Sequence, residues 1–425
     1  MAGAPEASEL QLKIAELGRR ARGAALRLNA LDSSARKAAL EQMAAALEAA
    51  TAQIQAANQR DVEAARAEGL SSAMLDRLEL TPARIAAMIA GVRQVAALPD
   101  PVGETINERE RPNGLRIRKV RVPLGVIAII YESRPNVTAD AAALCVKTGN
   151  AVILRGGKEA TFSNRAIAEA LRHGLAASGV PADAVQLVQE ADREAVRELV
   201  RLDEYVDVVI PRGGEGLIRA VAEMATVPLL KHYKGVCHVF VDKSADPNMA
   251  LEICLNAKCQ RPGVCNAMET LLVHKAIAET FLPSLAQAMG ERGVELRVDQ
   301  AARQWIPQAH AATDCDWGAE YLDLILAVRV VDSVEEAIAH INTYGSRHTD
   351  AIVARDEQAL NRFVTDVDSG VVVQNASTRF NDGGEFGMGA EMGISTDKLH
   401  ARGPVGPEEL TTYKYVVTGS GQVRG

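Results

Sequence analysis

The stretch Pro123-Leu-Gly-Val-Ile-Ala-Ile-Ile130 is a continuous apolar run rich in β-branched residues, which is typical of a strand buried on both faces of a parallel sheet. A helical segment over residues 139–148 follows, and then a second buried strand over 151–154. This order predicts an α/β fold. The loops 131–136 and 155–158 follow neighbouring parallel strands, so we expect both at the sheet edge where open α/β folds bind ligands.

The same alternation of strand and helix continues along most of the chain. Strands at 185–188 and 206–210 extend the first sheet, and a second α/β unit begins near the strand 236–241. Residues 8–97, in contrast, are predicted to be helical. The predicted helices are 10–28, 34–58, 61–68 and one that begins at Thr81-Pro82, and the further strands are 269–273, 320–331, 349–354 and 371–375.

Two segments alternate between apolar and polar residues, which predicts strands with one exposed face. The segment 114–122 follows the turn Pro112-Asn113-Gly114 and is predicted to lie in a hairpin, and 410–418 is a terminal strand. An isolated hairpin is only marginally stable. We therefore expect 410–418 to pair with it, in the same or another subunit.

Composition and charge exclude several classes of partner. The 425-residue chain has a net charge of −8 and no long run of basic residues, so neither nucleic acid nor an anionic membrane is an expected partner. No apolar run approaches the roughly 20 residues that span a bilayer. The N-terminus lacks the pattern of a signal peptide, so a cytoplasmic location is expected.

The cysteines do not indicate a disulfide scaffold or a metal site. Six cysteines are too few to staple a chain of this length. Cys254, Cys259 and Cys265 cluster, but their separations of five and six residues match no zinc-binding motif. We therefore expect no metal.

The loop Gln260-Arg-Pro-Gly-Val-Cys-Asn-Ala267 places Cys265 in a turn-prone segment just before an apolar run. The thiolate is the reactive form of cysteine, and Arg261 and the loop amides would favour it. Cys265 is therefore the candidate nucleophile. The alternative is a buried small apolar residue, because free cysteines are commonly buried.

Two glycine-rich loops could hold phosphate. One loop, 155–158, places Arg155 and Lys158 around two glycines, and the other, 211–216, precedes a helix whose N-terminus offers free amides. The G-x-G-x-x-G fingerprint is missing, because Arg219 stands where the third glycine belongs. A regular Rossmann motif is therefore not predicted.

Three motifs together resemble one known family: Val122-Pro-Leu-Gly-Val-Ile-Ala-Ile-Ile-Tyr-Glu-Ser-Arg-Pro-Asn136, Thr148-Gly-Asn-Ala-Val-Ile-Leu-Arg-Gly-Gly-Lys158 and Gln260-Arg-Pro-Gly-Val-Cys-Asn266. They resemble the γ-glutamyl phosphate reductase (glutamate-5-semialdehyde dehydrogenase) branch of the aldehyde dehydrogenase superfamily, over essentially the whole chain. The resemblance implies NADPH-dependent reduction of L-glutamate 5-phosphate to L-glutamate 5-semialdehyde with release of phosphate, the second step of proline biosynthesis. It also implies that the enzyme works beside a separate glutamate 5-kinase, because the acyl phosphate that the two enzymes share is labile.

The resemblance further implies three parts and a homo-oligomer. The NADP(H)-binding domain would cover 1–108 and 122–234, the catalytic domain 235–405, and the oligomerisation strands 109–121 and 406–425.

The same resemblance assigns roles to residues. Cys265 aligns with the catalytic cysteine. Asn136, with the Cys265 N–H, is the expected oxyanion donor, although Glu132 takes that place when no gap is allowed. Arg134 or Arg261 would balance the charge of the substrate phosphate. The expected cofactor-binding residues are Arg155, Gly156, Gly157, Lys158, Arg212, Gly213, Gly214 and Glu320.

One departure from oxidising relatives concerns the segment Leu229-Leu-Lys-His-Tyr-Lys-Gly235. It carries His232 and no carboxylate, whereas hydrolytic members of the superfamily carry there a Glu that activates water. Loss of that base fits a reductase, whose thioester must survive until hydride arrives. The alternatives are an oxidising aldehyde dehydrogenase of the same fold and a non-catalytic scaffold, and the intact Cys265 loop argues against the scaffold.

Overall fold

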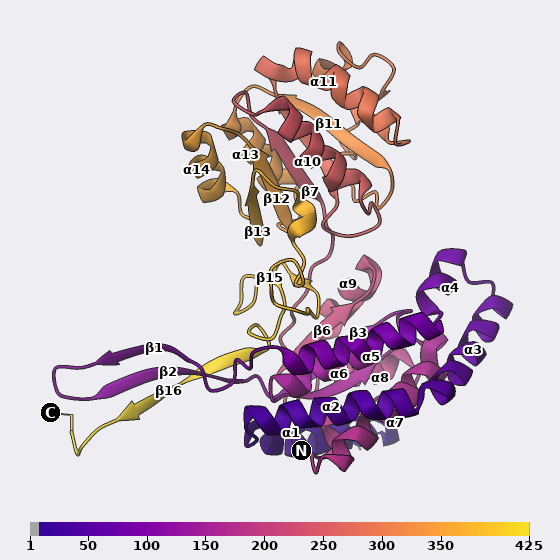
Figure 1. Cartoon of the computed structure of the whole chain (residues 1–425), viewed down its shortest axis with the longest axis vertical. Helices are drawn as coiled ribbons and strands as arrows, with labels where there is room; N and C mark the ends of the chain where they lie inside the picture. Colours follow the sequence, from indigo (N-terminus) through magenta and orange to yellow (C-terminus); the bar gives the residue numbers. More distant parts are fainter. Residues whose placement is uncertain (1–7, 425) are drawn as a thin grey trace, which may run out of the picture. The chain divides into compact units, whose positions relative to one another are not determined.

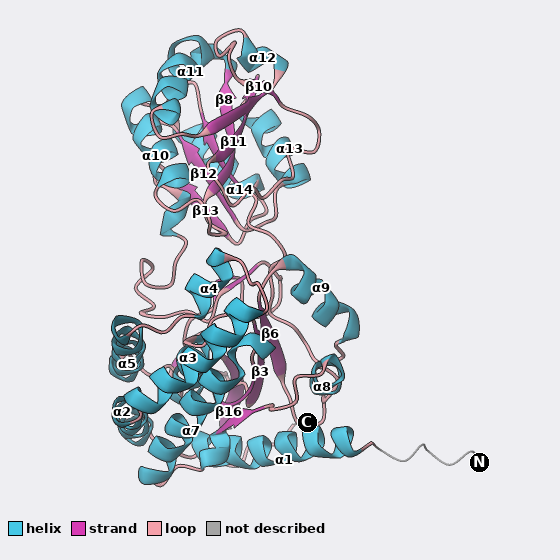
Figure 2. Cartoon of the chain, turned by 90° about the vertical axis from the view of Figure 1, so that its right-hand side faces the viewer, coloured by secondary structure: helices cyan, strands magenta, loops and turns pink. Residues whose placement is uncertain are grey.

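The computed structural model describes residues 8–424, which divide into two compact units. Unit 1 contains the described residues up to Lys231, Gly387–Gly393 and the chain from Val405 onward, and unit 2 contains His232–Phe386 and Ile394–Pro404. Both units are α/β, as the sequence predicts (Figures 1 and 2). None of the helices in residues 8–424 has the length and apolar character to span a membrane.

Unit 1 begins with five helices, and all but the third start at a residue whose side chain caps the helix. Ser8 forms a capping box with Gln11, Asp32 caps the second helix, and Thr81 with Pro82 starts the fifth, as predicted. The predicted helices 34–58 and 61–68 are wrong in two respects: the first is broken at Ala50, and the chain is one continuous helix from Thr51 to Ala67. The helices are α1 Glu9–Asn29, α2 Ser33–Ala49, α3 Thr51–Ala67, α4 Ser72–Leu78 and α5 Pro82–Ala97.

A four-stranded parallel sheet forms the centre of unit 1, with strand order β5-β4-β3-β6. Val126, Ala128 and Ile130 of β3 pack with α1 and α9, and the alternating Ile127 and Ile129 are also fully buried. Burial of both faces explains the uninterrupted apolar run. The elements are β3 Val126–Tyr131, α6 Val137–Lys147, β4 Ala151–Arg155, the 3-10 turns Lys158–Ala160 and Ala182–Ala184, α7 Thr161–Ala177, β5 Val185–Leu187, α8 Arg193–Leu199, β6 Val208–Arg212 and α9 Glu215–Met224.

A separate three-stranded antiparallel sheet belongs to unit 1. It consists of β1 Thr105–Glu110, β2 Arg116–Pro123 and β16 Thr411–Thr418, in the order β1-β2-β16 (Figure 1). The predicted hairpin and the predicted pairing with the terminal strand are both confirmed, and the pairing lies within one chain. Tyr413, Tyr415 and Val417 alternate along β16 and are exposed.

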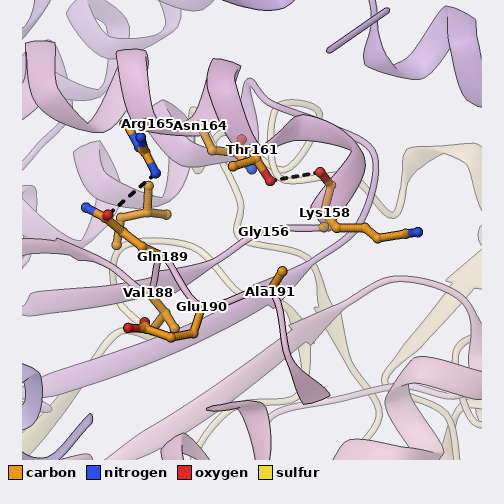
Figure 3. A pocket seen from close by; sticks show the side chains of 11 residues that line it. Gly156, Lys158, Thr161, Asn164, Arg165, Val188, Gln189, Glu190 and Ala191 are labelled. Atoms are coloured by element: carbon orange, nitrogen blue, oxygen red, sulfur yellow. Dashed lines mark hydrogen bonds between the residues drawn. The ribbon is translucent and has the colours of Figure 1, made fainter. Parts of the chain in front are cut away.

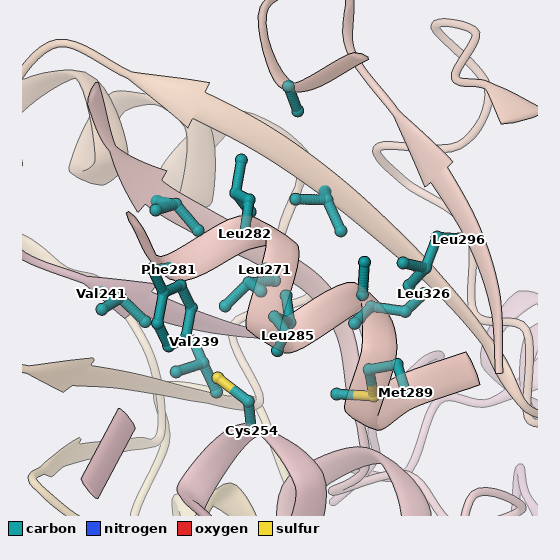
Figure 4. Packing of buried hydrophobic residues seen from close by; sticks show 14 of the residues in the cluster. Val239, Val241, Cys254, Leu271, Phe281, Leu282, Leu285, Met289, Leu296 and Leu326 are labelled. Atoms are coloured by element: carbon teal, nitrogen blue, oxygen red, sulfur yellow. The ribbon is translucent and has the colours of Figure 1, made fainter. Parts of the chain in front are cut away.

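Unit 2 is built on a seven-stranded parallel sheet with the order β10-β9-β11-β8-β7-β12-β13. Side chains that alternate along β7 face opposite layers: Val239 and Val241 pack with α10 and α11 (Figure 4), and Phe240 packs with α13 and α14. The elements are β7 Cys237–Val241, α10 Pro247–Cys259, β8 Met268–His274, α11 Lys275–Gly290, β9 Glu295–Val298, α12 Gln300–Arg303, β10 His310–Ala311, β11 Ile325–Val331, α13 Val334–Tyr344, β12 Thr349–Val353, α14 Glu357–Asp366, β13 Val371–Gln374, the 3-10 turn Thr378–Phe380, β14 Ile394–Ser395 and β15 Gly403–Pro404.

Two strand predictions for unit 2 need correction. The segment 320–331 becomes a strand only from Ile325, so Glu320 lies in the preceding loop. The strand at 371–375 is an edge strand and only half-buried, because it pairs on one side with β12. The short β9 and β10 and the helix α14 were not predicted.

Candidate active site

Cys265 lies in the loop between α10 and β8, as the sequence predicts, and is half-buried. The loop leads into the amino end of β8. The neighbouring strands β7 and β12 begin at Cys237 and Thr349, so their leading segments reach the same end of the sheet. Residues far apart in the sequence are thereby brought to Cys265.

The backbone of Cys265 is held by β7 and the segment before it. The Cys237 thiol donates a hydrogen bond to the Cys265 carbonyl oxygen at 3.2 Å. A Cβ added at Gly235 would lie 1.9 Å from the same oxygen, so the close approach requires glycine. Glu320 accepts a hydrogen bond from the Gly235 amide at 2.8 Å. Glu320, expected from the resemblance to contact the cofactor, therefore also fixes the segment behind the nucleophile.

A buried ion pair supports both ends of this loop. Lys258, in the last turn of α10, lies 2.6 Å from Glu269 of β8, and both side chains are fully buried. Glu269 also accepts a hydrogen bond from the Leu322 amide at 3.1 Å. Burial raises the pKa of Glu269 to about 7, although Lys258 opposes the shift. The sequence gave no sign of this pair, because neither residue belongs to a motif.

Two histidines accompany Cys265. One potential ligand atom each of His232, Cys265 and His348 lies within 4.8 Å of the other two, and the histidine rings meet edge-on with centroids 5.3 Å apart. His348 is fully buried, and its burial holds the pKa of the imidazole well below its usual value. The sequence singled out His232 but gave no sign of His348.

Arg379 is a second residue that the sequence did not indicate. Its backbone belongs to the turn beside the Cys265 loop, where Asn266 donates a hydrogen bond to the Asn381 carbonyl at 2.9 Å. The Arg379 guanidinium donates to Gln260 at 2.8 Å. Burial lowers the pKa of Arg379 and the charge of Arg261 lowers it further, whereas Asp382 and the Cys265 sulfur oppose the shift. The loop therefore carries Arg261, as predicted, together with an unpredicted second cation.

In unit 1, the two predicted ligand loops do lie together. The backbone amide of Ser133 and its hydroxyl both donate to Glu159, at 2.6 Å and 2.8 Å. Ser133 has a positive φ of 43°, an uncommon conformation for a residue other than glycine. The Glu159 carboxylate therefore ties the loop after β3 to the loop after β4.

Asn136, the expected oxyanion donor, is the N-cap of α6. Its side-chain amide donates to Asp140 at 2.9 Å, which leaves one of its two amide hydrogens for another acceptor. Burial raises the pKa of Asp140 to about 6, and the Asn136 hydrogen bond opposes this shift. The roles of Asn136 and of Arg134, which follows β3 on an exposed turn, stay predictions.

A hollow opens beside the loop after β4 (Figure 3). Three of the four residues expected there, Gly156, Gly157 and Lys158, line it. Arg155 does not; its guanidinium donates to the carbonyl oxygens of Gly156 and Ala191, at 3.0 Å and 2.7 Å. Arg165 supplies a further cation, which the sequence did not indicate. The other lining residues are Thr161, Asn164, Leu187, Val188, Gln189, Glu190 and Ala191.

The second glycine-rich loop is held by Glu132. Its carboxylate accepts a hydrogen bond from the Gly214 amide at 3.0 Å, and a Cβ at Gly213 would lie 2.4 Å from the same carboxylate. The Arg212 guanidinium packs on the backbone of Gly393, whose positive φ of 128° favours glycine at that position. These contacts give Arg212, Gly213 and Gly214 structural roles beside the cofactor contacts expected of them.

Comparison with known proteins agrees with this arrangement of two parallel sheets and a cysteine loop. Residues 4–313 match the model of the aldehyde dehydrogenase family. The chain therefore belongs to the aldehyde dehydrogenase family, whose members are oxidoreductases that use nicotinamide cofactors.

Its relatives within that family are gamma-glutamyl phosphate reductases. Those of Moorella thermoacetica and Geotalea daltonii are 58% and 56% identical, each over 97% of this chain and 99% of its own. The crystal structure of gamma-glutamyl phosphate reductase from Thermotoga maritima matches with a TM-score of 0.95 at 47% identity, covering 97% of this chain and 100% of that one. An engineered glycolyl-CoA reductase with bound NADP+ shares the fold, with a TM-score of 0.64 at 16% identity.

Proposed function

We propose that this protein reduces L-glutamate 5-phosphate to L-glutamate 5-semialdehyde with NADPH and releases phosphate, the second step of proline biosynthesis. The observation that carries the proposal is the Cys265 loop. Gly235 and Cys237 hold its backbone in place. The relatives that are 58% and 56% identical over 97% of this chain are named for this reaction.

Cys265 acts as the nucleophile. Its thiolate forms a bond to the acyl carbon of the substrate, the bond between that carbon and the phosphate oxygen breaks, and phosphate leaves. The result is a thioester on Cys265. Arg261 and Arg379 lie beside this loop, so they favour the thiolate and balance the negative charge of the leaving phosphate. NADPH, when bound, supplies the hydride that reduces the thioester carbon. The carbon–sulfur bond then breaks, which frees the aldehyde and restores the Cys265 thiolate.

The segment beside Cys265 protects the thioester from water. A hydrolytic enzyme needs a base there, and residues 229–235 contain no carboxylate. His232 stands in this segment, and its Nδ1 is engaged with the Ile394 carbonyl oxygen at 2.8 Å. This supports reduction over the alternative of an oxidising, hydrolytic aldehyde dehydrogenase.

Unit 1 is the proposed NADP(H)-binding part. We assign the adenosine end of the cofactor to the hollow beside β4, because its lining combines glycine backbone with the cations Lys158 and Arg165. Since the Arg155 guanidinium is bonded to two backbone carbonyls, we assign the 2′-phosphate to Lys158 and Arg165 and keep Arg155 as the residue that shapes the loop.

We also infer where the enzyme works, which enzyme supplies its substrate and how its subunits assemble. We place it in the cytoplasm, near a glutamate 5-kinase that supplies the labile acyl phosphate. The three-stranded sheet of β1, β2 and β16 would form the homo-oligomer, because Tyr413, Tyr415 and Val417 expose apolar surface along its terminal strand.

The test is the reaction in reverse. With glutamate 5-semialdehyde, the protein should reduce NADP+ only when phosphate is present, whereas an oxidising dehydrogenase would do so without phosphate. Cys265→Ser should abolish turnover and leave NADPH binding unchanged, and the exposed Cys315→Ser should retain full activity. Activity in Cys265→Ser would refute the assignment of the nucleophile.

A further inference from the structure

His232, Cys265 and His348 form a cluster of metal-ligating side chains in unit 2. They lie in the segments that lead into three adjacent strands, β7, β8 and β12, at the same end of the sheet. One potential ligand atom from each lies within 4.8 Å of the other two. This set differs from the three clustered cysteines of the sequence, which offered no metal-binding spacing.

His348 provides an independent sign that a ligand belongs here. The side chain is fully buried, and its Nδ1 lies 2.8 Å from the Thr349 hydroxyl. Its Nε2 has no hydrogen-bond partner among the described residues. A buried polar atom without a partner costs about 1–3 kcal/mol, so it calls for an explanation such as an ion.

His232 is oriented in the way that metal-bound histidines are. Its Nδ1 is 2.8 Å from the backbone carbonyl oxygen of Ile394, which orients the ring. Histidines that ligate metals commonly donate their other ring N–H to a backbone carbonyl or a carboxylate. Both rings are therefore held by partners on one nitrogen, and they meet edge-on beside Cys265.

We propose that His232, Cys265 and His348 bind Zn²⁺ and that this metal inhibits the enzyme reversibly by occupying the Cys265 sulfur. One thiolate and two imidazoles suit Zn²⁺, which takes four tetrahedral ligands, and water fills the fourth position. Donor atoms of such a site are roughly 3.5 Å apart, so small side-chain rotations close the cluster. Hard cations such as Mg²⁺ prefer oxygen ligands and do not fit.

Zn²⁺ binds the Cys265 sulfur as the thiolate, so the fraction of Cys265 that is protonated releases its proton on binding, and no electrons are transferred. A sulfur held by Zn²⁺ cannot attack the acyl carbon. Inhibition of the enzyme by Zn²⁺ rests on the proposed function of Cys265 as the nucleophile, whereas the binding of Zn²⁺ to the three side chains does not. Metal binding and thiol protection are therefore measured directly, without substrate.

The first experiment titrates the full chain, free of chelators, with Zn²⁺ in a calorimeter. We expect one Zn²⁺ per chain and a loss of affinity of about 100-fold in both Cys265→Ser and His232→Gln. Cys315→Ser is the matched control, because Cys315 is exposed beside His310 and could hold a surface ion. Loss of binding in Cys315→Ser, with binding retained in Cys265→Ser, would overturn the proposal.

The second experiment measures alkylation of Cys265 by iodoacetamide, identified by mass spectrometry. Zn²⁺ should slow the reaction at least tenfold, a chelator should restore it, and Mg²⁺ should have no effect. His348→Gln tests the buried ligand, and circular dichroism checks that this variant folds; His232→Gln gives the same test at a half-buried position. Equal alkylation of Cys265 with and without Zn²⁺ would refute the site, even if the reductase activity is confirmed.

Discussion

The backbone of Gly235 packs directly on that of Cys265: a Cβ at position 235 would lie 1.9 Å from the Cys265 carbonyl oxygen and 2.6 Å from its Cα. Because both neighbours are backbone atoms, Gly235→Ala must displace the Cys265 loop. A displacement of about 1 Å at a reacting group costs roughly 100-fold in rate, so we expect kcat/KM to fall by about that factor. Steady-state kinetics measure it.

A matched glycine separates this effect from the general cost of adding a methyl group. Gly290 ends α11 in the same unit, and a Cβ there would meet nothing within 4 Å. Gly290→Ala should keep the parent rate and stability. If Gly235→Ala were as active as Gly290→Ala, the close approach of these two backbones would have no role in catalysis.

The first sheet could be predicted because its strands are buried on both faces. The run from Val126 to Ile130 is too short and too uniformly apolar for an amphipathic helix. The helix and the strand after it follow in the expected order. Short or edge elements such as β9 carry too few residues for a pattern. The break at Ala50 was missed because helical residues continue on both sides of it.

The site was predictable only where it is local in sequence. Cys265 and Arg261 share one loop, so the sequence identified both. His348 and Arg379 reach Cys265 through the pairing of β7, β8 and β12 and the turn after β13, and strand order cannot be read from single residues. The cofactor contact expected of Arg155 stays a prediction; the sequence shows a cation there but not the two backbone carbonyls that its guanidinium also binds.

Arg379→Gln should reduce the reactivity of Cys265. Removing a cation next to the sulfur disfavours the thiolate, so the rate of iodoacetamide modification at pH 7.5 should fall about tenfold, and the KM for glutamate 5-phosphate should rise. Arg355→Gln is the control, because Arg355 lies in the same unit with 70% of its side chain exposed and pairs with Asp246 at the surface. Equal alkylation rates in the two variants would show that Arg379 does not act on the sulfur.

Lys258→Met should destabilise unit 2 by about 3–5 kcal/mol at pH 8, because it leaves the Glu269 carboxylate buried without its partner. Both tryptophans, Trp305 and Trp317, lie in unit 2, so their fluorescence during urea unfolding reports on that unit. Lys275→Met, at an exposed pair with Asp332, should change the free energy of unfolding by less than about 0.5 kcal/mol.

The loss in Lys258→Met should shrink as the pH falls. Burial already raises the pKa of Glu269 to about 7 with Lys258 present, and the folded variant holds the proton more tightly still. At a pH between the raised pKa of folded Glu269 and its unfolded value of about 4.5, the folded state binds a proton on Glu269 that the unfolded state does not bind. Acidification therefore stabilises the folded variant. A destabilisation by Lys258→Met that is equal at pH 8 and pH 5 would contradict the buried charge as its cause.

The buried His340 should give the free energy of unfolding of the parent protein the opposite pH dependence, a loss of stability on acidification. The ring is buried against Trp317, Tyr344 and His238, and its Nδ1 accepts a hydrogen bond from Arg329 at 3.0 Å. Burial lowers the pKa of His340 to about 3, with the charges of His238 and Arg329 adding to the shift. Below the unfolded value of about 6.5, the unfolded state therefore binds a proton that the folded state does not.

Lowering the pH from 7 to 5 should accordingly remove about 2 kcal/mol from the free energy of unfolding of unit 2 through His340 alone, measured by tryptophan fluorescence in urea. His340→Gln cannot take up that proton, so its stability should fall by that much less over the same interval. His310→Gln, which replaces an exposed histidine of the same unit, is the control. If His340→Gln and His310→Gln showed the same slope, the buried neutral imidazole of His340 would not be the source of the acid sensitivity, and another of the buried histidines, such as His348, would have to account for it.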